Sequence, residues 1–75
     1  MVGNRNSPQN IDQHIGFRLS KRRRALGISR VTLSEKTLIP VNELKGYENG
    51  ARIKPTSLLA LGDALQTDIR YFFRN

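Results

Sequence analysis

The chain has 75 residues and no cysteine, and its 13 Lys and Arg against 6 Asp and Glu give a formal net charge of +7. This length allows one small domain with one core, which leaves no room for a second catalytic or ligand-binding domain. Disulfides and thiolate metal sites are excluded, and the excess of positive charge indicates a polyanionic partner, most often nucleic acid. Apolar runs are too short for a transmembrane helix or a signal peptide, so we expect a cytoplasmic, nucleoid-associated protein.

The N-terminal part of the chain predicts a short arm and one long helix. Residues 1–10 are polar and contain glycine and proline, so we expect a flexible arm before a domain over residues 11–75. A helix is predicted over residues 11–26, with Asn10 in a capping box and Gly27 as its stop. Its apolar stripe consists of Ile11, Ile15, Leu19 and Leu26. The KRRR run near its end is either an electrostatic anchor for DNA phosphates or a solvated helix end, because four consecutive residues circle a helix.

Two short helices are predicted next, joined by a tight turn. Ser29 can cap a helix over residues 30–37, and Pro40 precedes a helix over residues 41–49 that ends at Gly50. The apolar residues of this stretch have the internal spacing of a helix-turn-helix, in which the second helix can enter the DNA major groove: Leu33, Ile39, Leu44 and Tyr47.

Two further helices complete the predicted fold. One spans residues 55–66, with an inward stripe of leucines, and the other spans residues 69–73, with Asp68 as its N-cap. No strand-like alternation is present, so the sequence predicts an all-α, compact five-helix bundle. The aromatic run Tyr71, Phe72 and Phe73 is a candidate dimer patch, with closure of the core as the alternative, which we favour for Phe72.

Several motifs, in this order and spacing, resemble the phage-repressor and Cro-like helix-turn-helix domain, the XRE family. They are IGFRLSKRRRALGIS, LSEK, YENG and LLALGDAL, and the resemblance covers roughly residues 11–73. It implies a lambda-repressor-like fold and a transcriptional regulator, a repressor, that binds a double-stranded DNA operator without a cofactor. It also implies that the protein acts as a homodimer.

The resemblance also assigns roles to individual residues. Positions that match base-contacting residues of the recognition helix are Val41, Asn42, Glu43, Lys45 and Gly46. Positions that match phosphate contacts are Ser29, Arg30, Asn49, Arg52 and Lys54. Arg23 and Glu48 match a structural salt bridge between the first and third helices. Asn can pair with adenine, Lys can reach guanine and Glu can accept from cytosine, although the carboxylate of Glu43 would also repel phosphates.

The chain departs from the family pattern at four positions. Family members usually have Gln at the position of Arg30, Gly at that of Leu38 and Ala at that of Ser34. Arginine keeps a donor and adds charge, so a phosphate contact remains expected. A left-handed Leu38 would cost about 1 kcal/mol or more. Gly46 should weaken the recognition helix by about 1 kcal/mol relative to alanine.

Two other classes of function are alternatives to DNA binding. A protein-binding adaptor or an antitoxin-like module would use the N-terminal arm and Phe17, which lies off the apolar stripe. An enzyme is not expected, because the sequence contains no paired carboxylates, no nucleophile with a base and no metal-ligand cluster. His14 is the single imidazole, so no metal site is expected either.

Overall fold

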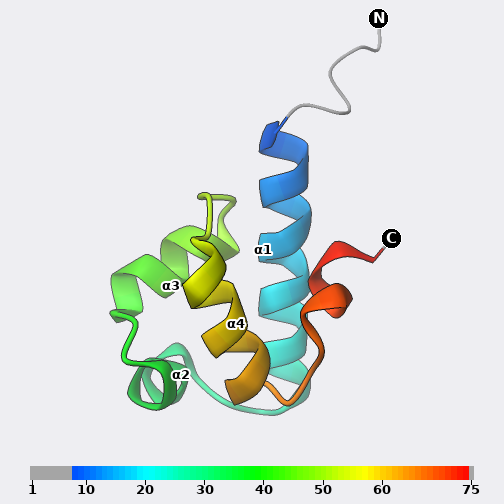
Figure 1. Cartoon of the computed structure of the whole chain (residues 1–75). Helices are drawn as coiled ribbons and strands as arrows, with labels where there is room; N and C mark the ends of the chain where they lie inside the picture. The colour runs from blue at the N-terminus through cyan, green and yellow to red at the C-terminus, as the bar shows by residue number, and fades with distance from the viewer. Residues whose placement is uncertain (1–7, 75) are drawn as a thin grey trace, which may run out of the picture.

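The computed structural model describes residues 8–74, and the side chains of residues 11–74. This part of the chain consists of four α-helices and one 3-10 helix, without strands (Figure 1): α1 (Pro8–Ala25), α2 (Arg30–Thr37), α3 (Val41–Glu48), α4 (Pro55–Ala64) and the 3-10 helix η2 (Ile69–Phe73). The all-α helix-turn-helix fold is therefore confirmed. The prediction of five α-helices is slightly wrong, because the last segment winds as a single short 3-10 element.

α1 begins at Pro8 rather than at Ile11. Proline is favoured in the first turn of a helix, where its missing N–H would have no intrahelical partner. Asn10 consequently lies inside the helix, so its predicted role as N-cap is wrong. The arm predicted over residues 1–10 therefore loses its last three residues to α1, and residues 1–7 lie outside the described part of the chain.

The other predicted boundaries hold to within one or two residues. After α1, Gly27 takes a φ of 71° and its N–H donates to the Arg24 carbonyl, which closes the helix as predicted. α3 ends at Glu48, with Asn49 as its C-cap. α4 ends at Ala64 instead of Gln66, because Gln66 has a left-handed φ of 56° that cannot continue a helix.

The two ends of α2 are closed by Ser29 and Leu38 in different ways. Ser29 caps α2, since its Oγ accepts a hydrogen bond of 3.1 Å from the Thr32 N–H. Leu38 ends α2 in the left-handed conformation, with a φ of 64°, and its N–H donates to the Ser34 carbonyl at 2.7 Å. Its side chain is 87% exposed, so no burial offsets the backbone strain. A residue that is usually glycine is thus a strained leucine here.

One core joins all the helices. Its buried side chains are Ile15, Leu19, Leu33, Ile39, Leu44, Tyr47, Leu58, Leu61, Leu65 and Phe72. The four apolar residues that predicted the helix-turn-helix are all among them. The ends of the predicted α1 stripe are not, because Ile11 is 52% exposed and Leu26 is 36% exposed. The N-terminal turns of α1 extend beyond the other helices (Figure 1), and Leu26 follows the last turn.

α1 is the central element of the domain. α3 packs on one side of α1, and η2 packs on the opposite side (Figure 1). Gly16 allows the close approach of α3, because a Cβ at this position would collide with the Tyr47 carbonyl oxygen. The distance between α1 and α3 therefore depends on the absence of a side chain at Gly16.

A buried ion cluster joins the first three helices. Glu48, whose side chain is 2% exposed, accepts from Arg23 Nε at 2.6 Å and Nη2 at 3.1 Å. Arg23 also donates to the Ile28 carbonyl at 3.0 Å, which fixes the α1–α2 loop. Arg30 contacts the same carboxylate, with its Nη2 2.9 Å from Glu48 Oε1. The salt bridge between Arg23 and Glu48 that the resemblance implied is present, and the sequence did not indicate that Arg30 would join it.

Two opposing effects determine the ionisation of Glu48. Burial by itself raises the pKa of this carboxyl group, but hydrogen bonds from Arg23 and Arg30 and the charges of both outweigh burial. The net pKa of Glu48 lies below its ordinary value of 4.5, and the same contacts raise the pKa of Arg23. Glu48 is therefore charged in the folded domain at neutral pH.

We expect Glu48→Gln to lower the free energy of unfolding by about 3 kcal/mol at neutral pH, because it leaves Arg23 without a counter-charge. Since the folded pKa of Glu48 is lowered, its contribution is complete above about pH 4.5 and is lost as the pH falls toward the folded pKa. Urea unfolding at neutral and acidic pH should therefore show a weaker acid dependence for the variant than for the wild type.

Arg30→Gln is the matched control, since it leaves the two hydrogen bonds between Arg23 and Glu48 in place. The Arg30 side chain is 33% exposed, so its removal should cost about 1 kcal/mol or less. Equal losses for Glu48→Gln and Arg30→Gln would contradict a cluster centred on Arg23 and Glu48.

We expect Leu38→Asn to raise the free energy of unfolding by about 0.5–1 kcal/mol, because asparagine tolerates the left-handed region better than leucine does. Urea unfolding measures the change. Leu59→Asn is the control, because Leu59 is also largely exposed but lies inside α4. There asparagine should cost about 0.5 kcal/mol through its weaker helix propensity. A loss of stability in Leu38→Asn would show that the strain at this turn is negligible.

Candidate nucleic-acid interface

The outward side of α3 carries a compact set of polar positions. Asn42, Lys45, Gly46 and Asn49 follow one another at helical spacing, so they share one side of the helix. The opposite side holds the buried Leu44 and Tyr47. Burial thus determines which side of α3 faces away from the core, and three of the five predicted base-contacting residues lie on it or at its leading end: Asn42, Lys45 and Gly46.

The remaining two predicted base-contacting residues lie at the margins of this side. Val41 is the first residue of α3 and is 39% exposed, which suits a contact with a thymine methyl group. Glu43 is exposed, but its Oε1 accepts a hydrogen bond of 3.2 Å from the Tyr47 hydroxyl. This bond holds the carboxylate toward the flank of α3, beside the outward side.

Two of the predicted phosphate-contacting residues already have partners in the free chain. The Ser29 hydroxyl donates to Thr32 Oγ1 at 3.2 Å, in addition to capping α2. Arg30 lies against Glu48, which brings the start of α2 next to the end of α3. Both residues sit at the first turn of α2, where backbone N–H groups and the helix dipole favour an anion.

The other three predicted phosphate-contacting residues follow α3 directly. Asn49 is exposed, and its N–H donates to the carbonyls of α3. Arg52 is 75% exposed and lies 3.9 Å from Asp12 of α1, a distance at which the pair leaves the guanidinium largely free. Lys54 is exposed and immediately precedes α4. The turn therefore places two exposed positive charges directly after α3.

A residue that matters for the position of α3 was missed in the sequence, namely Gly16. Its contact with the carbonyl of Tyr47 seats α3 against α1. The available signal was a glycine in the middle of an otherwise helical pattern, which costs about 1 kcal/mol relative to alanine and therefore indicates a packing reason.

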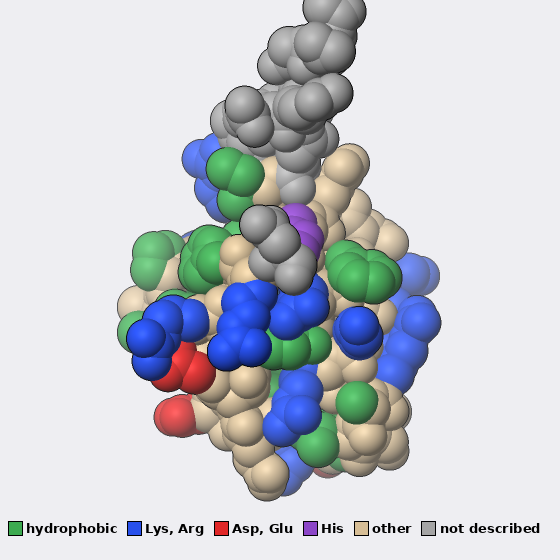
Figure 2. Space-filling model, turned by 90° about the vertical axis from the view of Figure 1, so that its right-hand side faces the viewer, with side chains coloured by type: hydrophobic (Ala, Val, Ile, Leu, Met, Phe, Trp, Pro, Cys, Tyr) green, Lys and Arg blue, Asp and Glu red, His purple; other side chains and the backbone are tan. Residues whose placement is uncertain are grey.

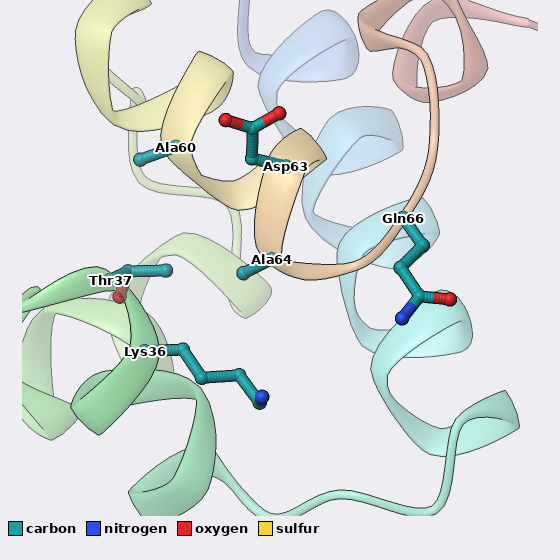
Figure 3. A pocket seen from close by; sticks show the side chains of 6 residues that line it. All are labelled: Lys36, Thr37, Ala60, Asp63, Ala64 and Gln66. Carbon is teal, nitrogen blue, oxygen red and sulfur yellow. The ribbon is translucent and has the colours of Figure 1, made fainter.

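Several hollows lie on the surface of the described part of the chain. One lies between the end of α2 and the end of α4 (Figure 3), and it is lined by Lys36, Thr37, Ala60, Asp63, Ala64 and Gln66. The Asp63 carboxylate points away from the Lys36 amino group. Within residues 8–74, no group of three His, Cys, Asp or Glu lies close enough together to hold a metal ion. No helix in this range is long and apolar enough to cross a membrane.

Comparison with known proteins places the whole arrangement in one family. The helix-turn-helix family model matches residues 19–72, which include α2, α3 and α4 entirely. An uncharacterized HTH-type transcriptional regulator of Sinorhizobium medicae is 32% identical over 76 residues, which cover 100% of this chain and 55% of that protein. An uncharacterized transcriptional regulator in the ATPase CF(0) region of Rhodospirillum rubrum is 34% identical over 64 residues, or 84% of this chain and 59% of that protein.

The chain thus spans about half the length of the curated relatives that it matches, from 50% to 59%. No solved structure gives a significant match. The family match covers the helix-turn-helix and the helices that support it, and the order of motifs in the sequence had indicated the same family. The chain belongs to the XRE-type helix-turn-helix family.

Proposed function

We propose that this protein is a DNA-binding transcriptional regulator that places α3 in the major groove of a double-stranded operator and represses by occupying it. The observation that carries the proposal is the orientation of α3. Its apolar side is buried and its end is held by the ion cluster, so its polar side faces away from the core. The family match and the names of the relatives support the same function.

The contacts divide into two kinds. Asn42 and Lys45 read base edges, since an amide pairs with adenine and an ammonium group reaches the acceptors of guanine. Gly46 lets the DNA approach the helix, and Val41 and Glu43 contact bases at the margins of the same side. Ser29, Arg30, Asn49, Arg52 and Lys54 hold the phosphate backbone on either side, which sets the register of α3.

Arg30 has two roles in this proposal. Its Nε and Nη2 lie within hydrogen-bond distance of Glu48, which fixes the guanidinium at the start of α2. An arginine has five N–H donors, so others remain for a phosphate. The guanidinium is therefore already oriented when DNA arrives, and less side-chain entropy is lost on binding.

We further propose that the protein binds as a homodimer to two half-sites about one helical turn apart. The aromatic run near the C-terminus contributes less than its sequence suggests. Phe72 is completely buried in the core, and Tyr71 lies beneath Arg18. Phe73 is 53% exposed and is the member of the run that is available to a second subunit.

Asn42→Ala should lose roughly 1–3 kcal/mol of binding free energy, mainly at one base pair, because a bidentate contact with adenine is removed. Binding is measured by anisotropy on sequences that the protein selects from a random duplex pool and on their single-base variants. Arg52→Ala is the control and should weaken binding to all sequences alike, with a smaller salt dependence. An equal loss for Asn42→Ala on selected and random duplexes would argue against base reading.

Gly46→Ala should stabilise the free domain and weaken DNA binding. A Cβ at Gly46 would meet only the Ala51 Cβ, at an ordinary 3.8 Å, so the helix gains about 1 kcal/mol in propensity. If Gly46 faces the DNA, the added methyl group should lower affinity about tenfold, or ~1.4 kcal/mol. Urea unfolding and anisotropy on one protein sample test both effects. A more stable variant with unchanged affinity would remove Gly46 from the interface.

A further inference from the structure

A second basic surface extends over the exposed side of α1 and over η2, which packs on α1. It is formed by the cations of α1 and of the C-terminal segment packed on it, and we call it the back surface: Arg18, Lys21, Arg22, Arg70 and Arg74. At its margin, Lys21 also lines a hollow that is bordered by Glu48 of α3. Figure 2 views this side of the molecule, where Lys and Arg side chains gather and Asp and Glu are confined to one edge.

Two of these arginines are held in place by the backbone. Arg22 Nε donates to the Leu65 carbonyl at 2.9 Å, and its Nη2 donates to the Gln66 carbonyl at 3.2 Å. Arg18 Nε donates to the Tyr71 carbonyl at 3.1 Å, and its guanidinium stacks 4.0 Å above the Tyr71 ring. These bonds leave Nη1 donors of both guanidinium groups unused, and they fix the groups without neutralising their charge.

The positive charges on the two sides of the domain are paired with carboxylates to different extents. Near α3, Glu48 pairs with both Arg23 and Arg30, and the positive charges that remain are those of Lys45, Lys54 and Arg52, whose Nε lies 3.9 Å from Asp12 Oδ2. On the back surface, within the described residues, Arg70 pairs with Asp68, while Arg18, Lys21, Arg22 and Arg74 have no carboxylate within salt-bridge distance. Within the described residues, a substantial part of the unpaired positive charge therefore lies on the back surface.

We propose that the back surface binds the phosphate backbone of a second DNA segment while α3 reads the operator, so that one domain connects two duplexes. This inference rests on the proposed function. Fixed guanidinium groups match phosphate oxygens bidentately, and contacts of this kind are independent of sequence. The unpaired charges favour an extended polyanion such as duplex DNA, because its closely spaced phosphates can meet several cations at once.

The test uses Lys21→Gln/Arg74→Gln, which removes two exposed positive charges and leaves the bonds of Arg18 and Arg22 intact. Lys36→Glu is the control, because it changes the net charge by the same amount at an exposed position of α2. Each protein is bound to an immobilised duplex of selected sequence, and capture of a labelled duplex of scrambled sequence is then measured. Binding of the scrambled duplex alone is titrated against salt in parallel.

The wild type and Lys36→Glu should capture the scrambled duplex, and the double variant should capture about tenfold less, with a salt slope lower by about 2. Its affinity for the selected duplex should stay within about twofold of the wild type, because its reading helix is unchanged. Equal capture by the double variant and the wild type would overturn the proposal, and preferred capture of single-stranded RNA would overturn the assignment to duplex DNA.

Failure of the proposed function gives a different result. In that case the wild type selects no sequence from a random pool, whereas the salt titration with scrambled duplex still reports on the back surface. A reduced slope in the double variant then supports phosphate binding at that surface, and an unchanged slope excludes it.

Discussion

The position of α3 depends on one buried carboxylate. Glu48 is the last residue of α3, and its oxygens join this helix to Arg23 of α1 and Arg30 of α2. Burying a carboxylate without counter-charges would be costly, so both guanidinium groups are needed. The close packing at Gly16 is needed as well, because it allows α3 to approach α1. Leu44 and Tyr47 are buried on the side of α3 that faces the core. They fix the orientation of α3 about its axis, so the polar side of the helix faces outward.

The same cluster changes how the charge of the protein is distributed. Because Arg23 and Arg30 pair with Glu48, the outward side of α3 and the turn after it carry only a modest positive charge, that of Lys45, Arg52 and Lys54. The guanidinium groups of Arg18 and Arg22 instead donate to the backbone carbonyls of Tyr71 and Leu65, which holds the chain after α4 against α1. Carbonyl acceptors do not cancel a charge, so the back surface remains strongly basic.

Apart from the winding of η2, the predictions that failed concern the ends of elements. The start of α1 moved to Pro8, α4 stopped at Ala64, and the outer residues of the α1 stripe are exposed. Local signals such as a possible capping box compete with several equivalent alternatives within a few residues of each other. The residue at which a helix actually ends depends on where the neighbouring helices no longer contact it. Ile11 lies beyond those contacts and is therefore exposed.

Apolar spacing, the Ser29 cap and the stop at Gly27 act locally, so the helices, the helix-turn-helix and its core could be predicted from the residues alone. The sequence also indicated the strained Leu38 and the pairing of Arg23 with Glu48, through the resemblance to the family. Other contacts depend on how the helices pack in three dimensions. Arg30 bonds to Glu48, and Tyr47 bonds to Glu43. Arg18 and Arg22 donate to backbone carbonyls of residues 71 and 65. Long charged side chains can reach many partners, and three-dimensional proximity selects among them.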